Sequence, residues 1–559
     1  MHDDLQMMRQ LEMEKCFHDG QIPCRWVPDM GYGFGFPLFN FYPPLPYLVG
    51  EVFRTLGFAF TDTAKLTFAL AIILSGVFMY LFSKEFFGRI GGVLSAIFYI
   101  WAPYHAVDIY VRGAMNESWA LVFFPLICWS AYRLIVASKK DELRWIILLA
   151  LAYFGLFTSH NLMLMIFTPV FGVYVLILLW QKNAWRKIPS LFIGGLWSLG
   201  LSAFFTFPAL FENKFTQIAG QLVGYYDYSG HFVTIRQLLF STFWGYGPST
   251  WLEEDGMSFQ IGYVHWILSL IVIGLLLGRF WMRRKEKLLD VLKTDKFLLI
   301  GFFLLAVGWF SGFMTHSRST PIWISVKQIA YLQFPWRFLT LIIFTFSFMI
   351  GAIPGIIADW KSKHNWFAKL SVTPFQIILS IILALSAVAY SWTYFLPQTG
   401  HMGTLTDSEK LSGKAWDLQQ TAGIYDYLPA TAKTAPKAPQ TSIAEVMEGE
   451  ASLSGLDQGT YWGLFNAKVE DEKAVVRIGM FDFPGMQVSI DGKVVDHYIP
   501  DTEEWGRMYV DVPQGEHKVY VQLLNTPVRT ISNIISLVCW GVLIGLIVFR
   551  RPFKRTSAQ

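Results

Sequence analysis

The chain of 559 residues is 53% hydrophobic and 17% aromatic, while only 15% of its residues are charged. An ordinary soluble domain carries about 25% charged residues, so this composition excludes a soluble globular protein and predicts an integral membrane protein. The formal net charge of +4 is small and gives no argument for a nucleic-acid partner.

The chain begins MHDDLQMMRQ, so two carboxylates, Asp3 and Asp4, stand side by side near its start. We predict that residues 1–63, which contain no apolar block of span length, form an exported first loop with amphipathic helices. Because an exported segment needs a signal peptide or a span ahead of it, we expect that a first span is missing from this chain. An aspartate directly before LQMMRQLEMEK also suits a helix N-cap, and Cys16 and Cys24 could pair if the segment is exported.

Apolar blocks near the length of about 20 residues that a helix needs to cross the hydrocarbon core recur along the rest of the chain. We predict about eleven membrane-spanning helices, near residues 64–83, 90–104, 116–135, 145–157, 162–180, 189–208, 259–278, 297–314, 337–357, 374–394 and 531–549. Residues 64–394 are therefore a predicted multi-span membrane domain, and residues 531–559 are a predicted last span with a basic tail.

Lysine and arginine are concentrated in alternate loops, and such loops stay on the cytoplasmic side during membrane insertion. These basic loops fall at residues 84–89, 139–144, 182–187, 279–296, 361–369 and 550–555. The long segments 209–258 and 395–530 are then expected on the outer face, together with residues 1–63. We predict a multi-pass protein of the cytoplasmic membrane of a prokaryote.

Residues 395–530 have a different character and predict an exported β-rich domain. After a linker rich in Pro, Ala and Thr at residues 429–441, the run VVRIGMFDFPGMQVSIDGKVV alternates with period two around the turn dipeptide Asp491-Gly492, which is a strong hairpin signal. Residues 515–524, GEHKVYVQLL, alternate in the same way. We predict a small β-sandwich before the last span.

Several short motifs follow one another in an order that resembles the C-type (GT-C) membrane glycosyltransferases, such as protein O-mannosyltransferases and the lipid A aminoarabinose transferase. Tyr42-Pro43-Pro44-Leu45 stands where those enzymes have an HPPL-like element, with tyrosine in place of histidine. A span, the basic turn SKEFFGRIGG, a second span and the run YVRGAMNESWALVFFPL follow. In that run, Arg112 and Glu117 stand for the arginine and the acid of the second exported loop, with glutamate where aspartate is common.

A more specific resemblance rests on QFPWRFL at residues 333–339, RGAMNE at 112–117 and SHN at 159–161. These motifs resemble a family labelled membrane protein 6-pyruvoyl-tetrahydropterin synthase-related, although the sequence contains no pterin-enzyme metal site. The resemblance covers most of the chain and implies a GT-C-like fold.

The resemblance also implies the transfer of a sugar from a polyprenyl-phosphate donor to an acceptor glycan, lipid or protein of unknown identity. Such a transfer needs a base that takes the proton from the acceptor hydroxyl, and cations that hold the departing phosphate. By this resemblance Asp3 or Asp4 is the base, while the other aspartate caps the first helix, and Glu117 is a further catalytic carboxylate.

Other candidate residues lie where predicted spans begin on the outer side. Arg112 and Glu117 could flank a ligand, or they could form an interfacial ion pair that anchors a helix. Arg337 could bind a lipid phosphate bidentately, or it could be a snorkelling arginine. His160 and Asn161 offer hydrogen-bond donors at an outward turn, although a histidine there is often merely solvated.

The outward loop 209–258 contributes Lys214 among aromatic residues. This pattern suits a glycan and its phosphate carrier, but it also suits a loop that lies on lipid headgroups. No His or Cys cluster has metal-ligand spacing. The cofactor is therefore unknown, and the sequence does not decide whether a divalent cation binds.

Two other classes of function stay open for this sequence. A transporter would carry charged residues in mid-span and broken helices in repeated halves, whereas the charges here are concentrated at the outer ends of the predicted spans. A non-catalytic scaffold for the assembly of cell-envelope glycans is the second alternative, because a fold does not fix a function. Membrane lipids are expected partners in each case.

Overall fold

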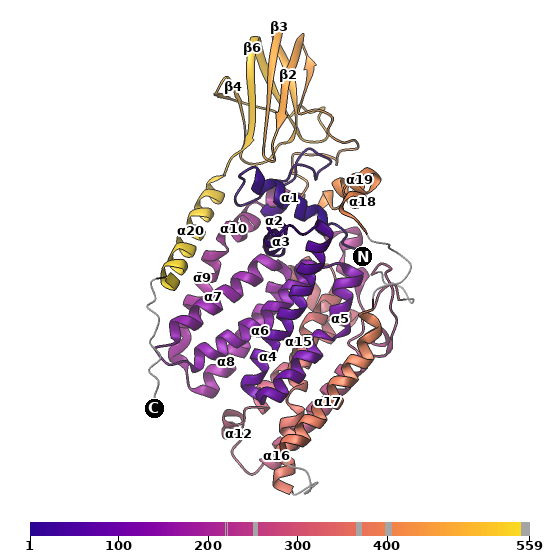
Figure 1. Ribbon diagram of the computed structural model, residues 1–559, viewed down its shortest axis with the longest axis vertical. Coiled ribbons are helices and arrows are strands. Elements are labelled where there is room, and N and C mark those ends of the chain that lie inside the picture. Colours follow the sequence, from indigo (N-terminus) through magenta and orange to yellow (C-terminus); the bar gives the residue numbers. More distant parts are fainter. Residues whose placement is uncertain (218–219, 221, 250–254, 365–371, 397–404, 549–559) are drawn as a thin grey trace.

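The computed structural model describes residues 1–559 apart from 218–219, 221, 250–254, 365–371, 397–404 and 549–559, and of residues 361–364 and 372 it describes the backbone alone. Helices make up most of its length, and an antiparallel sheet lies at one end (Figure 1). The predicted fold class, a helical protein with a small β-rich part before its last helix, is confirmed at this level. The predicted cytoplasmic tail at 550–555 and Lys369 lie outside the described residues.

Three short helices form the amino-terminal segment beneath the sheet: α1 (Gln6–His18), α2 (Leu38–Phe41) and α3 (Leu45–Thr55). The longer helices of the bundle are α4 (Phe60–Ile100), α6 (Met115–Val136), α7 (Glu142–Ser159), α8 (Asn161–Lys182), α9 (Ile188–Leu201), α10 (Ala203–Phe211), α11 (Tyr263–Met282), α13 (Leu298–Met314), α15 (Leu339–Ile350), α16 (Ile353–His364), α17 (Val372–Ser391) and α20 (Pro527–Val548). Short helices connect them: α5 (Pro103–Ala106), α12 (Leu288–Thr294), α14 (Thr320–Ser325), α18 (Asp407–Lys410) and α19 (Gly413–Thr421).

Eight of the described helices are long and apolar enough to cross a membrane, or up to ten if each of two bent pairs is one span. The bent pairs are Trp185–Leu201 with Ala203–Phe211, at 75°, and Leu288–Thr294 with Leu298–Met314, at 83°. Two predicted spans, 189–208 and 297–314, fall on these pairs. The count of about eleven spans stays a prediction.

The long helix α4 reverses its direction at Gly88, where φ is 73° and ψ is −177°. Gly76 lies so close to Ile100 that a Cβ on the glycine would be 3.0 Å from Cγ2 of the isoleucine. In a straight helix these two residues would be about 36 Å apart. The two arms therefore lie side by side, in agreement with separate spans near 64–83 and 90–104, and the positive φ at the turn suits glycine.

Two helices, α6 and α15, run through the interior of the bundle. All twelve residues of α15, LTLIIFTFSFMI, are buried, as expected for a helix that is apolar on every face. It packs against α4, where the hydroxyl of Ser95 donates a hydrogen bond to the carbonyl of Phe348 at 3.0 Å. Because α6 and α15 are packed in the interior, they fix the positions of the residues at or just before their first turns, at the end of the bundle that carries the sheet.

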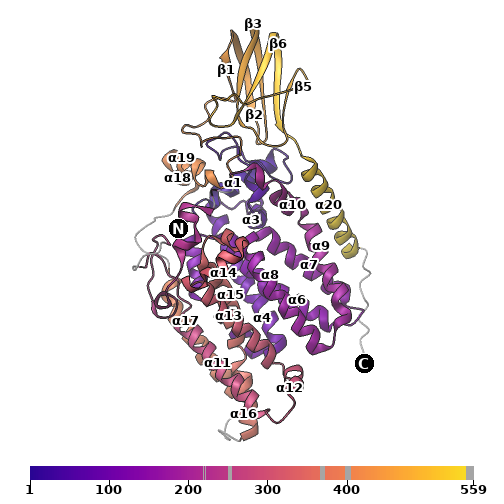
Figure 2. The same cartoon turned by 180° about the vertical axis from the view of Figure 1, so that it is seen from behind.

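The segments that the charge pattern assigns to opposite faces of a membrane lie at opposite ends of the molecule. Helices α1, α2, α3, α18 and α19 lie at the end that carries the sheet, whereas α12 and α16 lie at the other end (Figures 1 and 2). Helix α12 belongs to the basic segment 279–296. The arrangement agrees with the predicted sidedness of these segments, which stays a prediction.

The sheet has six antiparallel strands, in the order β1-β3-β6-β4-β5, with β2 also paired to β3. The strands are β1 (Ala444–Glu448), β2 (Ala451–Gln458), β3 (Trp462–Phe481), β4 (Met486–Ile490), β5 (Lys493–Val495) and β6 (Arg507–Leu523). The predicted hairpin is confirmed, because Ile490 pairs with Lys493. Asp491 and Gly492 both have positive φ, at 49° and 80°, as a two-residue type I′ turn requires.

The predicted β-sandwich is corrected to a single hydrogen-bonded sheet among the described strands. Strands β3 and β6 pair along nearly their whole lengths, from Trp462 opposite Gln522 to Phe481 opposite Arg507. Strands β1 and β2 both pair with β3, along different stretches of it. The period-two pattern shows which residues share a face, but it does not show how the strands are divided between sheets.

The amino-terminal segment is joined to the base of the sheet by side-chain contacts. The carboxylate of Asp19 accepts hydrogen bonds from the backbone N–H and the hydroxyl of Thr460, at 2.6 and 2.7 Å, and from Trp462 Nε1 at 3.1 Å. Within the segment, Cys16 and Cys24 form a disulfide. Trp462 therefore links the sheet to the amino-terminal segment through its hydrogen bond to Asp19.

A buried ion pair ties α10 to the start of α20. The carboxylate of Glu212 accepts hydrogen bonds from Arg529 Nε at 2.9 Å, from Asn40 Nδ2 at 2.9 Å and from the hydroxyl of Thr526 at 2.5 Å. Glu212 and Arg529 are both buried. This network joins α2, α10 and α20 through one carboxylate.

We predict that Glu212→Gln lowers the midpoint of thermal unfolding of the full chain in detergent, followed by tryptophan fluorescence. Breaking a buried ion pair leaves an unpaired charge and costs about 3–5 kcal/mol. The control is Asp62→Asn, which breaks an exposed pair with Lys65 and should hardly change the midpoint. Equal midpoints for the two variants would contradict a stabilising role for the buried network.

Candidate functional site

A cavity of about 1270 Å³ lies at the sheet end of the bundle. Segments that are far apart in the sequence meet around it. They include the motifs YPPL, RGAMNE, SHN and QFPWRFL. Its lining includes His2, Asp3, Asp4, Arg9, Tyr42, Pro43, Arg112, Asn116, Glu117, His160, Asn161, Tyr225, Tyr226, Trp336, Arg337, Lys410 and Asp426. All the predicted site residues except Lys214 are in this lining.

The centre of one wall is Glu117, whose side chain is 1% exposed. Its Oε2 lies 2.8 Å from Arg112 Nη2, 3.5 Å from Arg337 Nε and 4.0 Å from His160 Nε2. Its Oε1 accepts a hydrogen bond from the hydroxyl of Tyr104 at 2.7 Å. One carboxylate therefore holds two guanidinium groups, and we call Glu117, Arg112, Arg337 and His160 the Glu117 cluster.

Arg112 is fixed by further contacts. It ends a short π-helix, η1 (Val107–Arg112), and Gly113 follows in the left-handed conformation with φ of 63°. Its Nη1 donates to the hydroxyl of Tyr104 at 3.0 Å and forms an ion pair with Asp108, and its guanidinium lies 4.4 Å from the centre of the Trp336 ring. Its orientation is therefore set by two carboxylates and an aromatic face.

His160 links the cluster to the start of α8. Its Nδ1 accepts a hydrogen bond from the backbone N–H of Leu162 at 3.2 Å, so the side chain caps this helix. Burial, followed by the positive charge of Arg337, lowers the pKa of His160 to about 3. The imidazole is therefore neutral near pH 7, with its proton on Nε2, which faces Glu117.

Three of the four members of the cluster come from the starts of long helices, and the fourth, Arg112, lies three residues before α6. Glu117 is in the first turn of α6, His160 is the N-cap of α8, and Arg337 is in the 3₁₀ turn η10 (Pro335–Phe338) that leads into α15. A helix N-terminus carries a partial positive charge and unpaired N–H groups. The fold therefore adds to the positive potential of the two arginines on this side of the cavity.

The first residues of the chain lie against the segment that carries Arg112. The backbone N–H of His2 donates to the carbonyl of Val111, and that of Asp3 to the carbonyl of Arg112, both at 2.8 Å. The carboxylate of Asp3 accepts two hydrogen bonds from Arg9 Nη1, at 2.8 and 3.0 Å. Asp3 is thus held beside the Glu117 cluster.

The prediction that one aspartate caps the first helix is wrong. Helix α1 begins at Gln6 after Leu5, and in the part of the chain that the structure describes no side chain makes a capping hydrogen bond there. Asp3 is paired with Arg9, whereas Asp4, 61% exposed, is paired with Lys410. A charged partner in the folded chain has displaced the local cap that the sequence favours.

Lys214 lies outside the cavity lining. It is in the 3₁₀ turn η3 (Asn213–Phe215), is exposed, and has its ammonium 5.1 Å from the centre of the Phe215 ring. The neighbouring Asn213 does line the cavity. In such a tight turn successive side chains point in different directions, so the sequence did not show which of the two would face inward.

Sequence reasoning missed Asp426, which ends the 3₁₀ turn η12 (Ile424–Asp426) and lines the cavity. Burial raises the pKa of Asp426 to about 6; the charge of Arg9 opposes this effect and that of Asp3 adds to it. Asp426 belongs to the segment predicted as a β-rich domain, where a lone acid between two tyrosines gave no signal. The lining residues Arg9 and Lys410 were also missed.

No group of three or more His, Cys, Asp and Glu side chains that could hold a metal ion was found in the part of the chain that the structure describes. The carboxylates of the cavity are instead paired with cations, as in the Arg9 and Lys410 pairs.

Comparisons with known proteins add little to this site. No protein-family model matches the chain. An uncharacterized protein of Lactococcus lactis subsp. cremoris (strain MG1363) is 26% identical over 204 residues, which are 35% of this chain and 33% of that protein. The match therefore spans about a third of the relative and brings no activity with it.

We predict that Asp426→Asn raises the unfolding temperature of the full chain at pH 8 and that this gain shrinks towards pH 5. The raised pKa of Asp426 means that folding disfavours its charged form. The stability of the wild type therefore falls as the pH rises from about 4 to about 6 and stays low above that. Thermal unfolding in detergent at a series of pH values measures the difference.

The matched control is Asp417→Asn, at an exposed aspartate in α19. Its effect on the unfolding temperature should not depend on pH. A gain for Asp426→Asn that is the same at pH 5 and pH 8 would contradict the raised pKa.

Proposed function

We propose that this protein is a membrane glycosyltransferase, which moves a sugar from a polyprenyl-phosphate donor to an acceptor on the outer face of the cytoplasmic membrane. The observation that carries the proposal is the cavity, in which two clustered arginines lie near carboxylates that belong to another part of the chain. The proposal is also supported by the resemblance to GT-C enzymes, because the motifs that carry this resemblance contribute residues to the cavity.

The positive charges of Arg112 and Arg337 suit the leaving group of the reaction, which is the polyprenyl phosphate. As the bond between the anomeric carbon and the phosphate oxygen breaks, negative charge grows on the polyprenyl phosphate. Arg112 and Arg337 stabilise that charge, and the helix N-termini beside them act in the same direction. The carboxylate of Glu117 already interacts with both arginines, so we assign it the role of a positioning residue in place of the catalytic role expected from the sequence.

The base in this proposal is Asp3. The acceptor oxygen bonds to the anomeric carbon, and its proton passes to the carboxylate of Asp3, which the backbone hydrogen bond to Arg112 holds beside the arginines. Asp426 shares the neighbourhood of Arg9 and Asp3, and its pKa near 6 lies closer to neutral pH than that of an ordinary aspartate. It is therefore the second carboxylate to be tested.

The place of the cavity favours an enzyme over a transporter. Glu117, His160 and Arg337 lie at the starts of long helices and not in their middle turns. Transporters typically bind their substrates near the midplane of the membrane. A cavity at the ends of the helices whose lining combines charged and apolar side chains instead suits a donor whose lipid tail stays in the membrane while its sugar reaches the surface.

We predict that Asp3→Asn lowers kcat for sugar transfer by about 100-fold or more and changes KM little, because a positioned general base contributes about 10²–10⁴-fold. Asp4→Asn is the matched neighbour: Asp4 is largely exposed and paired with Lys410, so its variant should keep kcat within about threefold. The measurement is the transfer of labelled sugar in membranes supplied with a panel of polyprenyl-phosphate sugars.

Arg337→Gln should lower kcat at least about tenfold. If Asp426 and not Asp3 is the base, Asp426→Asn should lower kcat by about 100-fold or more, and the residual activity should lack the acid limb of the pH–rate profile. Transfer by wild type that Asp3→Asn leaves unchanged would exclude Asp3. A wild-type protein that transfers no sugar from any donor of the panel would overturn the glycosyltransferase proposal, and uptake by proteoliposomes would then test the transporter alternative.

A further inference from the structure

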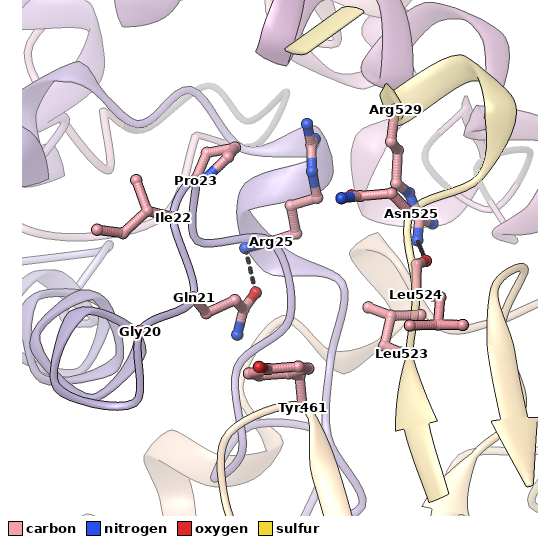
Figure 3. Close-up of a pocket in the computed structure, with 10 residues that line it drawn as sticks. All are labelled: Gly20, Gln21, Ile22, Pro23, Arg25, Tyr461, Leu523, Leu524, Asn525 and Arg529. Carbon is pink, nitrogen blue, oxygen red and sulfur yellow. Dashed lines mark hydrogen bonds between the residues drawn. The ribbon is translucent and has the colours of Figure 1, made fainter. Parts of the chain in front are cut away.

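A second pocket, of about 150 Å³, lies where the amino-terminal segment meets the end of β6 and the start of α20. It shares no lining residue with the large cavity. Its lining consists of Gly20, Gln21, Ile22, Pro23, Arg25, Tyr461, Leu523, Leu524, Asn525 and Arg529 (Figure 3). Two of these lining residues are arginines, Arg25 from the amino-terminal segment and Arg529 from α20.

Arg25 is 4% exposed and only partly satisfied. Its Nη2 donates to the carbonyl of Phe204 and to Asn533 Oδ1, both at 2.8 Å, and its Nη1 donates to Asn40 Oδ1 at 3.2 Å. Its Nε has no hydrogen-bond partner among the described residues. All these acceptors are neutral, so within the described ranges no carboxylate is hydrogen-bonded to Arg25.

Arg529 is 1% exposed and has one carboxylate partner, Glu212. Its Nη1 donates to the carbonyl of Leu524 at 3.3 Å, whereas its Nη2 is buried without a hydrogen-bond partner in the described part of the chain. Glu212 is shared with Asn40 and Thr526, so its oxygens are already occupied.

The pocket therefore has an excess of positive charge. Two buried guanidinium groups face one carboxylate, and burial, followed by the charge of Arg529, lowers the pKa of Arg25 to about 9. Arg25 is still cationic at pH 7. A buried charge without a partner is costly, and each arginine retains a nitrogen that could donate to a further acceptor. A bound anion would supply both the missing charge and the missing acceptors.

We propose that this pocket binds one phosphate group through Arg25 and Arg529. Its volume equals about five water molecules at ~30 Å³ each, which is enough for a phosphate group with a few attached atoms. Guanidinium groups suit phosphate oxygens because they donate in a planar fork. The phosphate is either a free anion or the headgroup of a lipid.

The surroundings are compatible with both sources. Helix α20, which begins two residues before Arg529, is long and apolar enough to cross a membrane. Ile22 at the rim of the pocket is 76% exposed, and Leu524 is also exposed. A phospholipid beside α20 could place its headgroup here, whereas inorganic phosphate could enter from the aqueous side.

The test is the thermal unfolding of the delipidated full chain in detergent. Inorganic phosphate or short-chain phosphatidylglycerol should raise the unfolding temperature by about 2 °C more than chloride at equal ionic strength. A rise with inorganic phosphate identifies a free anion, and a rise with phosphatidylglycerol alone identifies a lipid headgroup. No rise with either probe would overturn the proposal.

Two variants keep both arginines in place. Asn525→Asp adds a carboxylate at the exposed mouth of the pocket and should weaken phosphate binding about tenfold by like-charge repulsion. Asn466→Asp, at an exposed position of β3 that is absent from the pocket lining, is the matched control and should respond like the wild type. Equal responses of the two variants would contradict the site.

A third variant tests the charge argument itself. Glu212→Gln removes the internal counter-ion of Arg529, so it should be stabilised more by the bound anion than the wild type is, although it is less stable in chloride. A smaller or equal gain in unfolding temperature would show that the pocket does not need an external anion. These outcomes do not depend on sugar transfer, which involves the large cavity.

Discussion

The interaction on which the candidate site depends is the ion pairing of one buried carboxylate, Glu117, with two arginines. Arg112 lies in the same motif as Glu117, whereas Arg337 lies more than two hundred residues further along the chain. Two guanidinium groups taken out of water repel one another, and they are stable together because a carboxylate lies between them. The pairing therefore fixes the spacing between the two guanidinium groups that we propose bind the donor phosphate.

The rest of the bundle supports this arrangement through the helices that lead away from it. Helix α6 begins beside Glu117, and the wholly buried α15 follows Arg337. Because a packed interior allows little movement, these helices hold the cluster rigidly, and His160 is held in the same way by its capping bond at α8. In the Glu117 cluster a second carboxylate, Asp108, also pairs with Arg112. At the small pocket Glu212 is the one carboxylate paired with a buried arginine among the described residues, and we propose that a bound anion supplies the missing charge.

The motifs that the sequence suggested are brought together in space, and in our proposal Glu117 becomes a positioning residue. The elements named from YPPL, RGAMNE, SHN and QFPWRFL all contribute to one cavity, although each motif is short. The rule for helix caps failed where a charged side chain offered a stronger partner, in one case six residues away and in the other from a distant segment. Asp3 and Asp4 were suited to a helix cap by their position, but Arg9 and Lys410 take both carboxylates. Asp426 carried no motif, so only its burial beside the cavity draws attention to it.

By itself the sequence determined that long apolar helices make up most of the chain, and it determined where they lie, the hairpin at Asp491-Gly492 and the motif residues that carry charge. These features follow from composition, periodicity and turn chemistry, which act over a few neighbouring residues. The tertiary structure alone decided which charges meet, that β3 and β6 pair into one sheet, and that Lys214 lies outside the cavity while Asp426 lines it. Which charges meet depends on how buried charges are compensated across the folded chain, and which strands pair depends on contacts between segments that are not neighbours in the sequence. No local pattern encodes either.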